Sequence, residues 1–325
     1  MAPESLHSAF GLIWSSPDLP LLDLPEVAPE EEGGGEMVVI SREGSGHWPP
    51  LPEGPLDTPW LQMAPGELRL QVEGIARFRI RDGERIAFAP RDGAVSDQDL
   101  RTFLLGSAVG AALIQRGMLV LHGNALERDG RAIVCLGPSK AGKSTLAYGL
   151  MRQGWQLLAD DLVAITPSGQ VLPGIPRIKL WHDAARAFGL DPDALPPIRQ
   201  GMRKVLLSGE AVRRASRPVP LKALYVLEGQ RLGGGETCQP SITPIGGERQ
   251  AVIALCEQSY RPRFVRGLGR EGSTFLALAR LQREVPPSRL RLPEGIAAMQ
   301  DWLLEQDLLQ GAGDGRTGNS SAGQA

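Results

Sequence analysis

The run GPSKAGKS, from Gly137 to Ser144, has a spacing of glycine and lysine that is typical of phosphate binding. It matches the pattern G-x-x-x-x-G-K-[ST], in which glycines let consecutive backbone N–H groups turn towards one anion. The positive end of a following helix adds to that attraction. In such a loop Lys143 is expected to reach the β- and γ-phosphates of ATP, and Ser144 to offer its hydroxyl to Mg²⁺. The residues expected to bind the nucleotide are Gly137, Pro138, Ser139, Lys140, Ala141, Gly142, Lys143, Ser144 and Thr145.

Two adjacent carboxylates, Asp160 and Asp161, directly follow the apolar run 155–159. If this run is a strand parallel to the one before the loop, both strands end at the same edge of the sheet, where α/β folds place their ligands. Paired carboxylates there are costly unless a cation or a proton-transfer role compensates them. We therefore expect one to bind Mg²⁺ and the other to accept a proton from an attacking hydroxyl. An exposed turn with two solvated acids is the alternative.

Two pairs of basic residues are candidates for contact with a transferring phosphoryl group. The chain has only five lysines among its 35 cationic residues, so the position of each lysine is informative. Arg177 and Lys179 are two residues apart and would point the same way on an extended strand, and Arg203 and Lys204 form a second pair. Phosphoryl transfer needs cations around the equatorial oxygens, which either pair could supply. The alternative is a solvated basic surface.

Short apolar runs at 118–121, 132–136 and 155–158 are typical of strands in a sheet that is covered on both faces. A helix is predicted over 143–152, so the loop belongs to a strand–loop–helix–strand unit. The run 221–227 predicts a central strand, and helical spacing recurs at 247–260, 272–283 and 295–309. The sequence therefore predicts an α/β fold for residues 117–309, with Cys135, Trp155 and Trp181 in its core.

The N-terminal third has a different composition. Residues 1–65 are rich in proline and glycine and predict an irregular region, in which the apolar pieces 10–14 and 37–40 are candidate edge strands. Residues 66–116 predict a smaller β-rich region: a hairpin that turns at Asp82-Gly83, then a helix over 97–116 with Ser96 as its N-cap. Residues 310–325 lack apolar side chains that could anchor them and predict a disordered tail.

Composition excludes several classes of protein. The 35 Lys and Arg against 37 Asp and Glu give a net charge of −2, which disfavours nucleic acid as a partner. The longest apolar stretch, 106–114, is well short of the roughly 20 residues that a membrane span needs. An early Glu4 and no basic start argue against a secretory signal. Three scattered cysteines favour neither disulfides nor zinc, so we expect a cytoplasmic protein with reduced thiols and no membrane partner.

The segment 122–165 resembles the catalytic core of the HPr kinase family, whose members pair a phosphate loop with an Asp-Asp sequence and share their fold with PEP carboxykinases. The resemblance implies a P-loop core of that type. It implies that Asp160 is the base towards a serine hydroxyl, that Asp161 binds metal or positions substrate, and that His122 is the family's histidine upstream of the loop. Lys140 stands where typical members carry glycine.

The segment 173–181 also matches divergent HPr-kinase-related proteins, some of which phosphorylate the C-terminal serine of a lasso-peptide precursor. We therefore expect an ATP- and Mg²⁺-dependent kinase that transfers the γ-phosphoryl group to a serine hydroxyl of a peptide or small protein. A small-molecule kinase shares every motif and stays open, as does a non-catalytic nucleotide-dependent regulatory module. Typical HPr kinases assemble into hexamers, so a homo-oligomer is among the assemblies that the resemblance allows.

Overall fold

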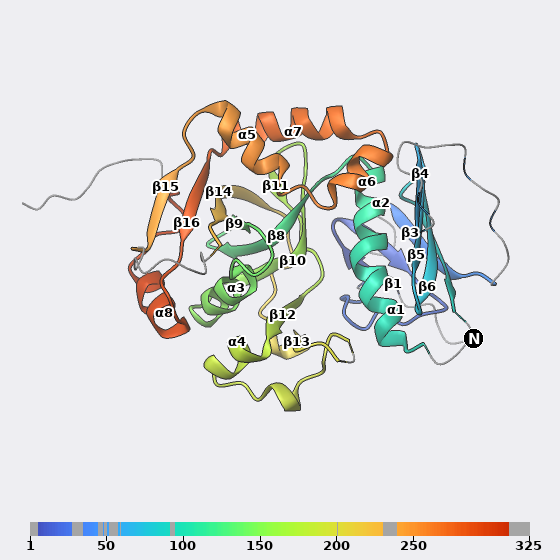
Figure 1. Ribbon diagram of the computed structural model, residues 1–325, viewed down its shortest axis with the longest axis horizontal. Coiled ribbons are helices and arrows are strands. Elements are labelled where there is room, and N and C mark those ends of the chain that lie inside the picture. The colour runs from blue at the N-terminus through green and yellow to red at the C-terminus, as the bar shows by residue number, and fades with distance from the viewer. Residues whose placement is uncertain are drawn as a thin grey trace, which may run out of the picture.

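The computed structural model describes residues 6–27, 35–44, 48, 51, 58, 60–91, 95–199, 201–229 and 239–311. In these ranges the chain forms a mixed α/β fold with two large sheets and a two-stranded ribbon, which confirms the predicted α/β class. Figure 1 shows a helical segment between the two large sheets, so the molecule has layers of sheet, helix and sheet, followed by further helices. Most of the predicted tail, from residue 312 on, lies outside the described residues.

The N-terminal sheet has the strand order β1-β2-β3-β7-β6-β5-β4. Its strands are β1 (Leu6–Ala9), β2 (Leu12–Ser15), β3 (Met37–Arg42), β4 (Leu61–Ala64), β5 (Glu67–Val72), β6 (Ala76–Arg81) and β7 (Arg85–Pro90). The prediction of an irregular region over 1–65 is wrong, because four of these strands lie within it. The predicted hairpin is confirmed: β6 and β7 pair antiparallel across Asp82 and Gly83, whose φ angles of 52° and 70° suit a tight hairpin turn.

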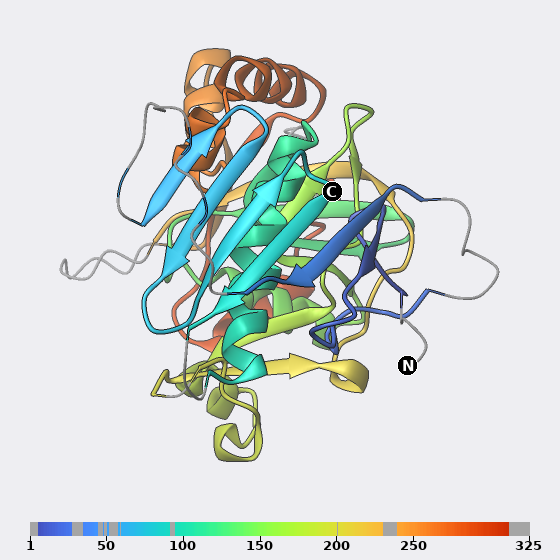
Figure 2. The ribbon, with the colours of Figure 1, turned by 90° about the vertical axis from the view of Figure 1, so that its right-hand side faces the viewer.

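A helical segment packs across this sheet (Figure 2). It consists of α1 (Asp97–Phe103), a π-helical turn over Leu104–Ala108 and α2 (Val109–Gln115). The predicted cap is confirmed, since the Ser96 side chain accepts a hydrogen bond from the Asp99 backbone N–H. Every residue from Leu104 to Gln115 is buried, because this segment lies between the N-terminal sheet and the rest of the molecule. The π-helical turn was not predicted.

The second sheet has the strand order β11-β10-β8-β9-β14-β16-β15. Its strands are β8 (Leu119–Arg128), β9 (Arg131–Leu136), β10 (Gln156–Ile165), β11 (Gln170–Val171), β14 (Val219–Leu227), β15 (Ser241–Pro244) and β16 (Pro287–Arg291). The predicted central strand is confirmed, since β14 pairs in parallel with both β9 and β16. β8 lies between β9 and β10 and is antiparallel to both.

Helices cover both faces of the second sheet, as predicted. On one face α3 (Lys143–Arg152) and α8 (Ile296–Leu304) pack through Leu150 and Leu303 on Ile133 and Tyr225. On the other face lie α5 (Glu248–Cys256) and α7 (Glu271–Glu284). The remaining elements are the ribbon of β12 (Arg177–Trp181) with β13 (Lys204–Ser208), and the short helices α4 (His182–Ala187) and α6 (Pro262–Gly267). Cys135 is buried as predicted, which raises the pKa of its thiol to about 12.

The strands β8 and β10 belong to two hydrophobic cores. On one face of these strands, Val120, Leu162 and Ala164 pack with the N-terminal sheet and the helix that covers it, whereas Leu126 and Leu157 pack in the core beneath α3 and α8. The boundary between the two cores therefore runs across these strands near residues 160–162. The second sheet thus contributes side chains of β8 and β10 to the core of the N-terminal sheet.

Candidate functional site

The loop over residues 137–145 connects β9 to α3, and its two motif glycines have clear structural reasons. Gly137 has φ 141°, and a Cβ atom there would lie 2.8 Å from the Leu227 carbonyl oxygen of β14. Gly142 has φ 91° and is the N-cap of α3. No side chain caps α3, so the first N–H groups of this ten-residue helix face the loop without a side-chain partner. A helix N-terminus in this state can attract an anion, so anion binding by the loop stays a prediction.

Lys143 folds back across the loop. Its ammonium donates hydrogen bonds to the carbonyl oxygens of Gly137, at 2.7 Å, and Pro138, at 3.0 Å. Burial lowers the pKa of Lys143, and the negative charges of Asp161 and Asp160 oppose that effect only in part. Lys143 lines the same cavity as both carboxylates.

Lys140 adopts a left-handed backbone, with φ 67°. Glycine adopts this conformation more easily than any residue with a Cβ, so the position suits the glycine that the resembling family carries there. We expect Lys140→Gly to raise the free energy of unfolding by about 0.5–1 kcal/mol in urea denaturation. Lys140→Ala is the matched control, because it removes the charge but keeps the Cβ. If Lys140→Ala raises the free energy of unfolding as much as Lys140→Gly does, the loss of charge and not the relief of the left-handed backbone explains the increase.

The sequence predicted that Asp160 and Asp161 directly follow a strand. This is wrong, because both residues lie in the middle of β10. β10 continues to Ile165 because its second half pairs with β8, where Asp160 lies opposite Asn124 and Asp161 opposite Gly123. The strand is irregular here, since Asp161 has φ 76°. β10 runs parallel to β9 in direction, but β8 lies between them. The acid pair nevertheless lies near the 137–145 loop, since both line one cavity.

Asp160 is buried and accepts two hydrogen bonds. The Asn124 side-chain amide donates to Oδ1, and the Lys179 backbone N–H donates to Oδ2 at 3.1 Å. Burial raises the pKa of Asp160 and the charge of Asp161 raises it further, and the cations of Lys179 and Arg177 do not compensate fully. A carboxylate with a raised pKa is a stronger base, so the environment of Asp160 suits it to accept a proton.

Asp161 has the opposite environment. Its Oδ2 lies 3.0 Å from the Lys179 ammonium, and its Oδ1 lies 3.1 Å from Nδ1 of His122. Burial alone would raise the pKa of Asp161, but Lys179 and His122 outweigh burial and lower it well below the usual range. Two adjacent carboxylates thus differ in proton affinity, which is the pattern expected where one is a base and the other remains an anion.

The four predicted basic residues lie at different depths along the β12–β13 ribbon. Arg177 is innermost and buried, with its guanidinium 2.8 Å from the carboxylate of Asp23 in the N-terminal region. Lys179 points the same way, as predicted, and binds Asp161. Lys204 is half-buried and Arg203 is exposed. Lys179, Arg203 and Lys204 line the same cavity as the loop, whereas Arg177 does not.

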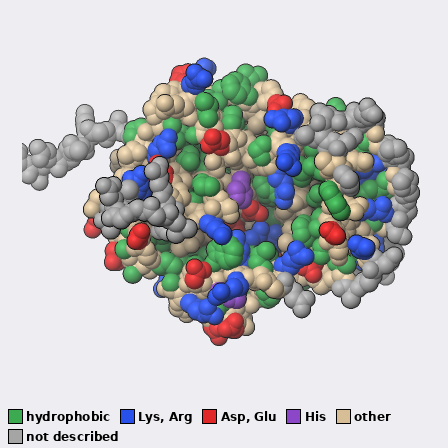
Figure 3. Space-filling view, in the orientation of Figure 1, with side chains coloured by type: hydrophobic (Ala, Val, Ile, Leu, Met, Phe, Trp, Pro, Cys, Tyr) green, Lys and Arg blue, Asp and Glu red, His purple; other side chains and the backbone are tan. Residues whose placement is uncertain are grey.

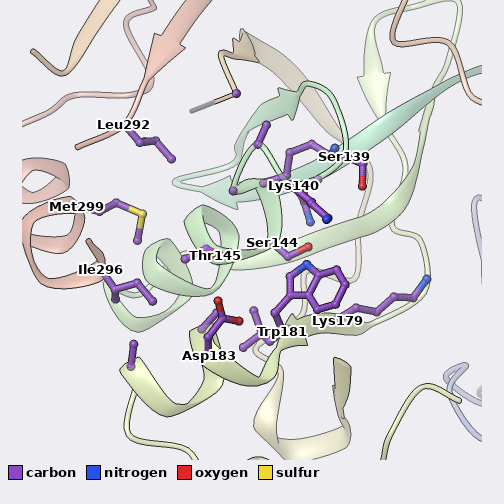
Figure 4. Close-up of a pocket in the computed structure, with 18 of the residues that line it drawn as sticks. Ser139, Lys140, Ser144, Thr145, Lys179, Trp181, Asp183, Leu292, Ile296 and Met299 are labelled. Carbon is purple, nitrogen blue, oxygen red and sulfur yellow. The ribbon is translucent and has the colours of Figure 1, made fainter. Parts of the chain in front are cut away.

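That cavity has a volume of about 1550 Å³ and is the central feature of the face shown in Figure 3, where Lys, Arg, His and acidic side chains gather around a hollow. We call it the central cavity. Figure 4 shows the loop and α3 on one side, the β12–β13 ribbon below and α8 on a further side. Four of the five lysines of the chain line it, namely Lys140, Lys143, Lys179 and Lys204.

The central cavity has few side chains that could hold a divalent cation. Within the described ranges no group of three or more His, Cys, Asp and Glu side chains is arranged to hold a metal ion. Mg²⁺ that binds with a nucleotide needs only one or two protein ligands, because phosphate oxygens and water supply the others. Ser144 and Asp161, the predicted ligands, are oxygen donors of the required type and both line the central cavity.

Sequence reasoning missed three residues at this site. Asn124, through its contact with Asp160, has a weak signal in the sequence: it stands two residues after His122 on the same strand and therefore on the same face. Gln258 accepts a hydrogen bond from the Gly137 N–H through its side chain and has no local signal. Trp181 was expected in the core, but its side chain lines the cavity and is 38% exposed. Trp155 is buried, as predicted.

No protein-family model matches this chain, and no curated protein matches it. Among the residues that the structure describes, no helix has the length and apolar character required to span a membrane.

Proposed function

We propose that this protein is an ATP-dependent kinase that transfers the γ-phosphoryl group to a serine hydroxyl of a peptide or small protein. The observation that carries the proposal is the central cavity itself. The 137–145 loop, the proposed phosphate site, lines this cavity together with two carboxylates whose pKa values are shifted in opposite directions. A phosphate site beside a buried base is the minimum arrangement for phosphoryl transfer to a hydroxyl.

The loop and the start of α3 would hold the phosphates of ATP. Backbone N–H groups between Gly137 and Ser144 would donate to phosphate oxygens, and Lys143 would exchange its bonds with the loop carbonyls for the β- and γ-phosphates. Mg²⁺ supplies charge neutralisation of the triphosphate when it is bound, with Ser144 and Asp161 as its protein ligands. The low proton affinity of Asp161 keeps it anionic, as a metal ligand must be.

The acceptor hydroxyl would lie at Asp160. Its proton passes to the Asp160 carboxylate as the hydroxyl oxygen forms a bond to the γ-phosphorus. The bond from that phosphorus to the β–γ bridging oxygen breaks, and the electron pair leaves with ADP. The cavity volume of about 1550 Å³ exceeds the roughly 300–1,000 Å³ of usual small-molecule sites, which favours an acceptor larger than a metabolite. The resemblance to HPr-kinase-related proteins supports serine as the acceptor.

Lys143→Ala tests the nucleotide site. We expect it to weaken ATP binding by about 10- to 100-fold in calorimetry with Mg²⁺, because the variant loses charge-assisted hydrogen bonds to phosphate. Lys222→Ala is the matched control, since Lys222 is the one lysine that does not line the central cavity and its side chain is exposed on β14. Unchanged ATP affinity together with unchanged turnover in Lys143→Ala would defeat the assignment of the loop.

Incubation with γ-labelled ATP and candidate peptides encoded near the gene identifies the acceptor. We expect mass spectrometry to find a gain of one phosphate on a peptide serine, and none with Lys143→Ala. Transfer to a metabolite in the absence of any peptide would instead favour a small-molecule kinase. ATP binding without transfer to any acceptor would favour a regulatory module.

A further inference from the structure

The gathering of lysines in one cavity needs an explanation of its own. Arginine outnumbers lysine in this chain, yet four of the five lysines line the central cavity. A lysine ammonium is a compact point charge that suits contact with phosphate. Three of the four have a clear place: Lys140 and Lys143 belong to the loop, and Lys179 is paired with Asp161. The role of Lys204, on β13, is not explained by any of these contacts.

Lys204 has an unusual set of neighbours. It is the direct cross-strand partner of Trp181 in the β12–β13 ribbon, and its ammonium lies 4.6 Å from the centre of the Trp181 ring. Within the described part of the chain its ammonium has no ion pair and no hydrogen bond. The ammonium is nevertheless influenced by the charges of Lys179, Asp160 and Asp161. Burial and the charge of Lys179 lower its pKa, and Asp160 and Asp161 oppose this effect. Its own charge in turn lowers the pKa of Lys143.

The three other basic residues predicted as phosphoryl contacts are less suitable. Arg177 is held by Asp23 and does not line the cavity, and Lys179 neutralises Asp161. Arg203 is exposed. Lys204 is half-buried and lines the central cavity together with Lys143 and the two carboxylates, the residues between which we propose that the γ-phosphate meets an acceptor hydroxyl.

We propose that Lys204 is a further catalytic residue, the cation that binds the phosphoryl group during transfer, and that Trp181 is the positioning residue that holds its ammonium in place. This inference rests on the proposed kinase function. As the bond from the γ-phosphorus to the bridging oxygen breaks and the bond to the serine oxygen forms, the three equatorial oxygens keep their negative charge. Lys204 donates to one of them from the acceptor side, while Lys143 binds from the nucleotide side. The cation–π contact leaves the ammonium hydrogens that point away from the ring free to do so.

Binding of ADP with and without aluminium fluoride separates this role from nucleotide binding in general. The fluoride complex mimics the transferring phosphoryl group, and such mimics bind enzymes more tightly than the ground-state ligand, here by about 10²-fold or more. In calorimetry with Mg²⁺ we expect Lys204→Ala to lose at least about 10-fold of that gain, while its affinity for ADP alone changes less than about 3-fold. Lys204→Arg keeps the charge and should recover part of the gain.

The remaining variants test the positioning role. In Trp181→Ala, the increase in ADP affinity caused by aluminium fluoride should be about 3- to 10-fold smaller than in the wild type. Trp181→Phe should lose less, because a phenyl ring still attracts the ammonium. Lys222→Ala, outside the cavity, should match the wild type. If Lys204→Ala keeps the full gain from aluminium fluoride, or if the wild type binds ADP but gains nothing, the role of Lys204 is refuted and the nucleotide site stands. If the wild type binds no ADP, the proposed function fails and this inference fails with it.

Discussion

Replacement of Asp160 by asparagine is expected to reduce phosphoryl transfer by at least about 10³-fold, since a general base contributes about 10²- to 10⁴-fold to the rate. The amide cannot accept the proton of the acceptor hydroxyl, whereas the loop and Lys143 are untouched. ATP affinity in calorimetry should therefore stay within about 3-fold of the wild type, since no phosphate contact is lost. An active Asp160→Asn variant would remove Asp160 from the role of base and leave the nucleotide site intact.

The same variant has an expected effect on stability. Folding raises the pKa of Asp160. The stability that protonated Asp160 contributes is therefore complete at a pH below its pKa in the unfolded chain, and it is lost as the pH rises through its pKa in the folded protein. Asparagine has no charge to desolvate at neutral pH, and a flip of the Asn124 amide would preserve both hydrogen bonds. We expect the unfolding temperature at pH 7 to be unchanged or higher. Asp161→Asn is the matched control and should lower it, because the pKa of Asp161 is lowered by folding.

Replacement of Asp23 by alanine is expected to lower the free energy of unfolding by about 3–5 kcal/mol, the usual result when one partner of a buried ion pair is removed. Asp23 and Arg177 lie 2.8 Å apart and their side chains are 14% and 7% exposed. Without Asp23, the Arg177 guanidinium stays buried without the carboxylate that pairs with it. Urea denaturation measures the loss.

Two further variants show whether the buried charge causes this effect. Asp18→Ala removes an exposed carboxylate that accepts a hydrogen bond from the Arg42 backbone N–H, and it should cost about 1 kcal/mol or less. The double variant Asp23→Leu with Arg177→Met removes both charges and should recover most of the loss. If the double variant is as unstable as Asp23→Ala, packing and not the unpaired charge accounts for the result.

The parts of the site that the sequence predicted depend on local structure. The 137–145 loop and α3 form from consecutive residues whose types prescribe the turn and the helix, and α3 begins and ends where predicted. The acid pair was found because it is adjacent in the sequence. Its place in the middle of β10 was missed because the strand is extended by pairing with β8, a contact that no local pattern reports.

Long-range contacts account for most of the other differences. Gln258 reaches Gly137 from 121 residues away, and Asn124 meets Asp160 only through the register of two strands. The N-terminal strands were hard to predict because β1, β2 and β4 have only four residues each, too few for a clear alternation. They are stable as one sheet because Trp14, Ile40 and Met63 are completely buried against the helical segment.

Because β8 and β10 contribute side chains to the N-terminal core and to the core beneath α3 and α8, the N-terminal third packs directly against the strands of the candidate site. Asp160 and Asp161 lie where the two cores meet, and the Asp23–Arg177 pair fastens the N-terminal layer beside them. We expect a partner that binds the N-terminal sheet to alter the positions of Asp160, the proposed base, and Asp161, although sheet and carboxylates are far apart in the sequence.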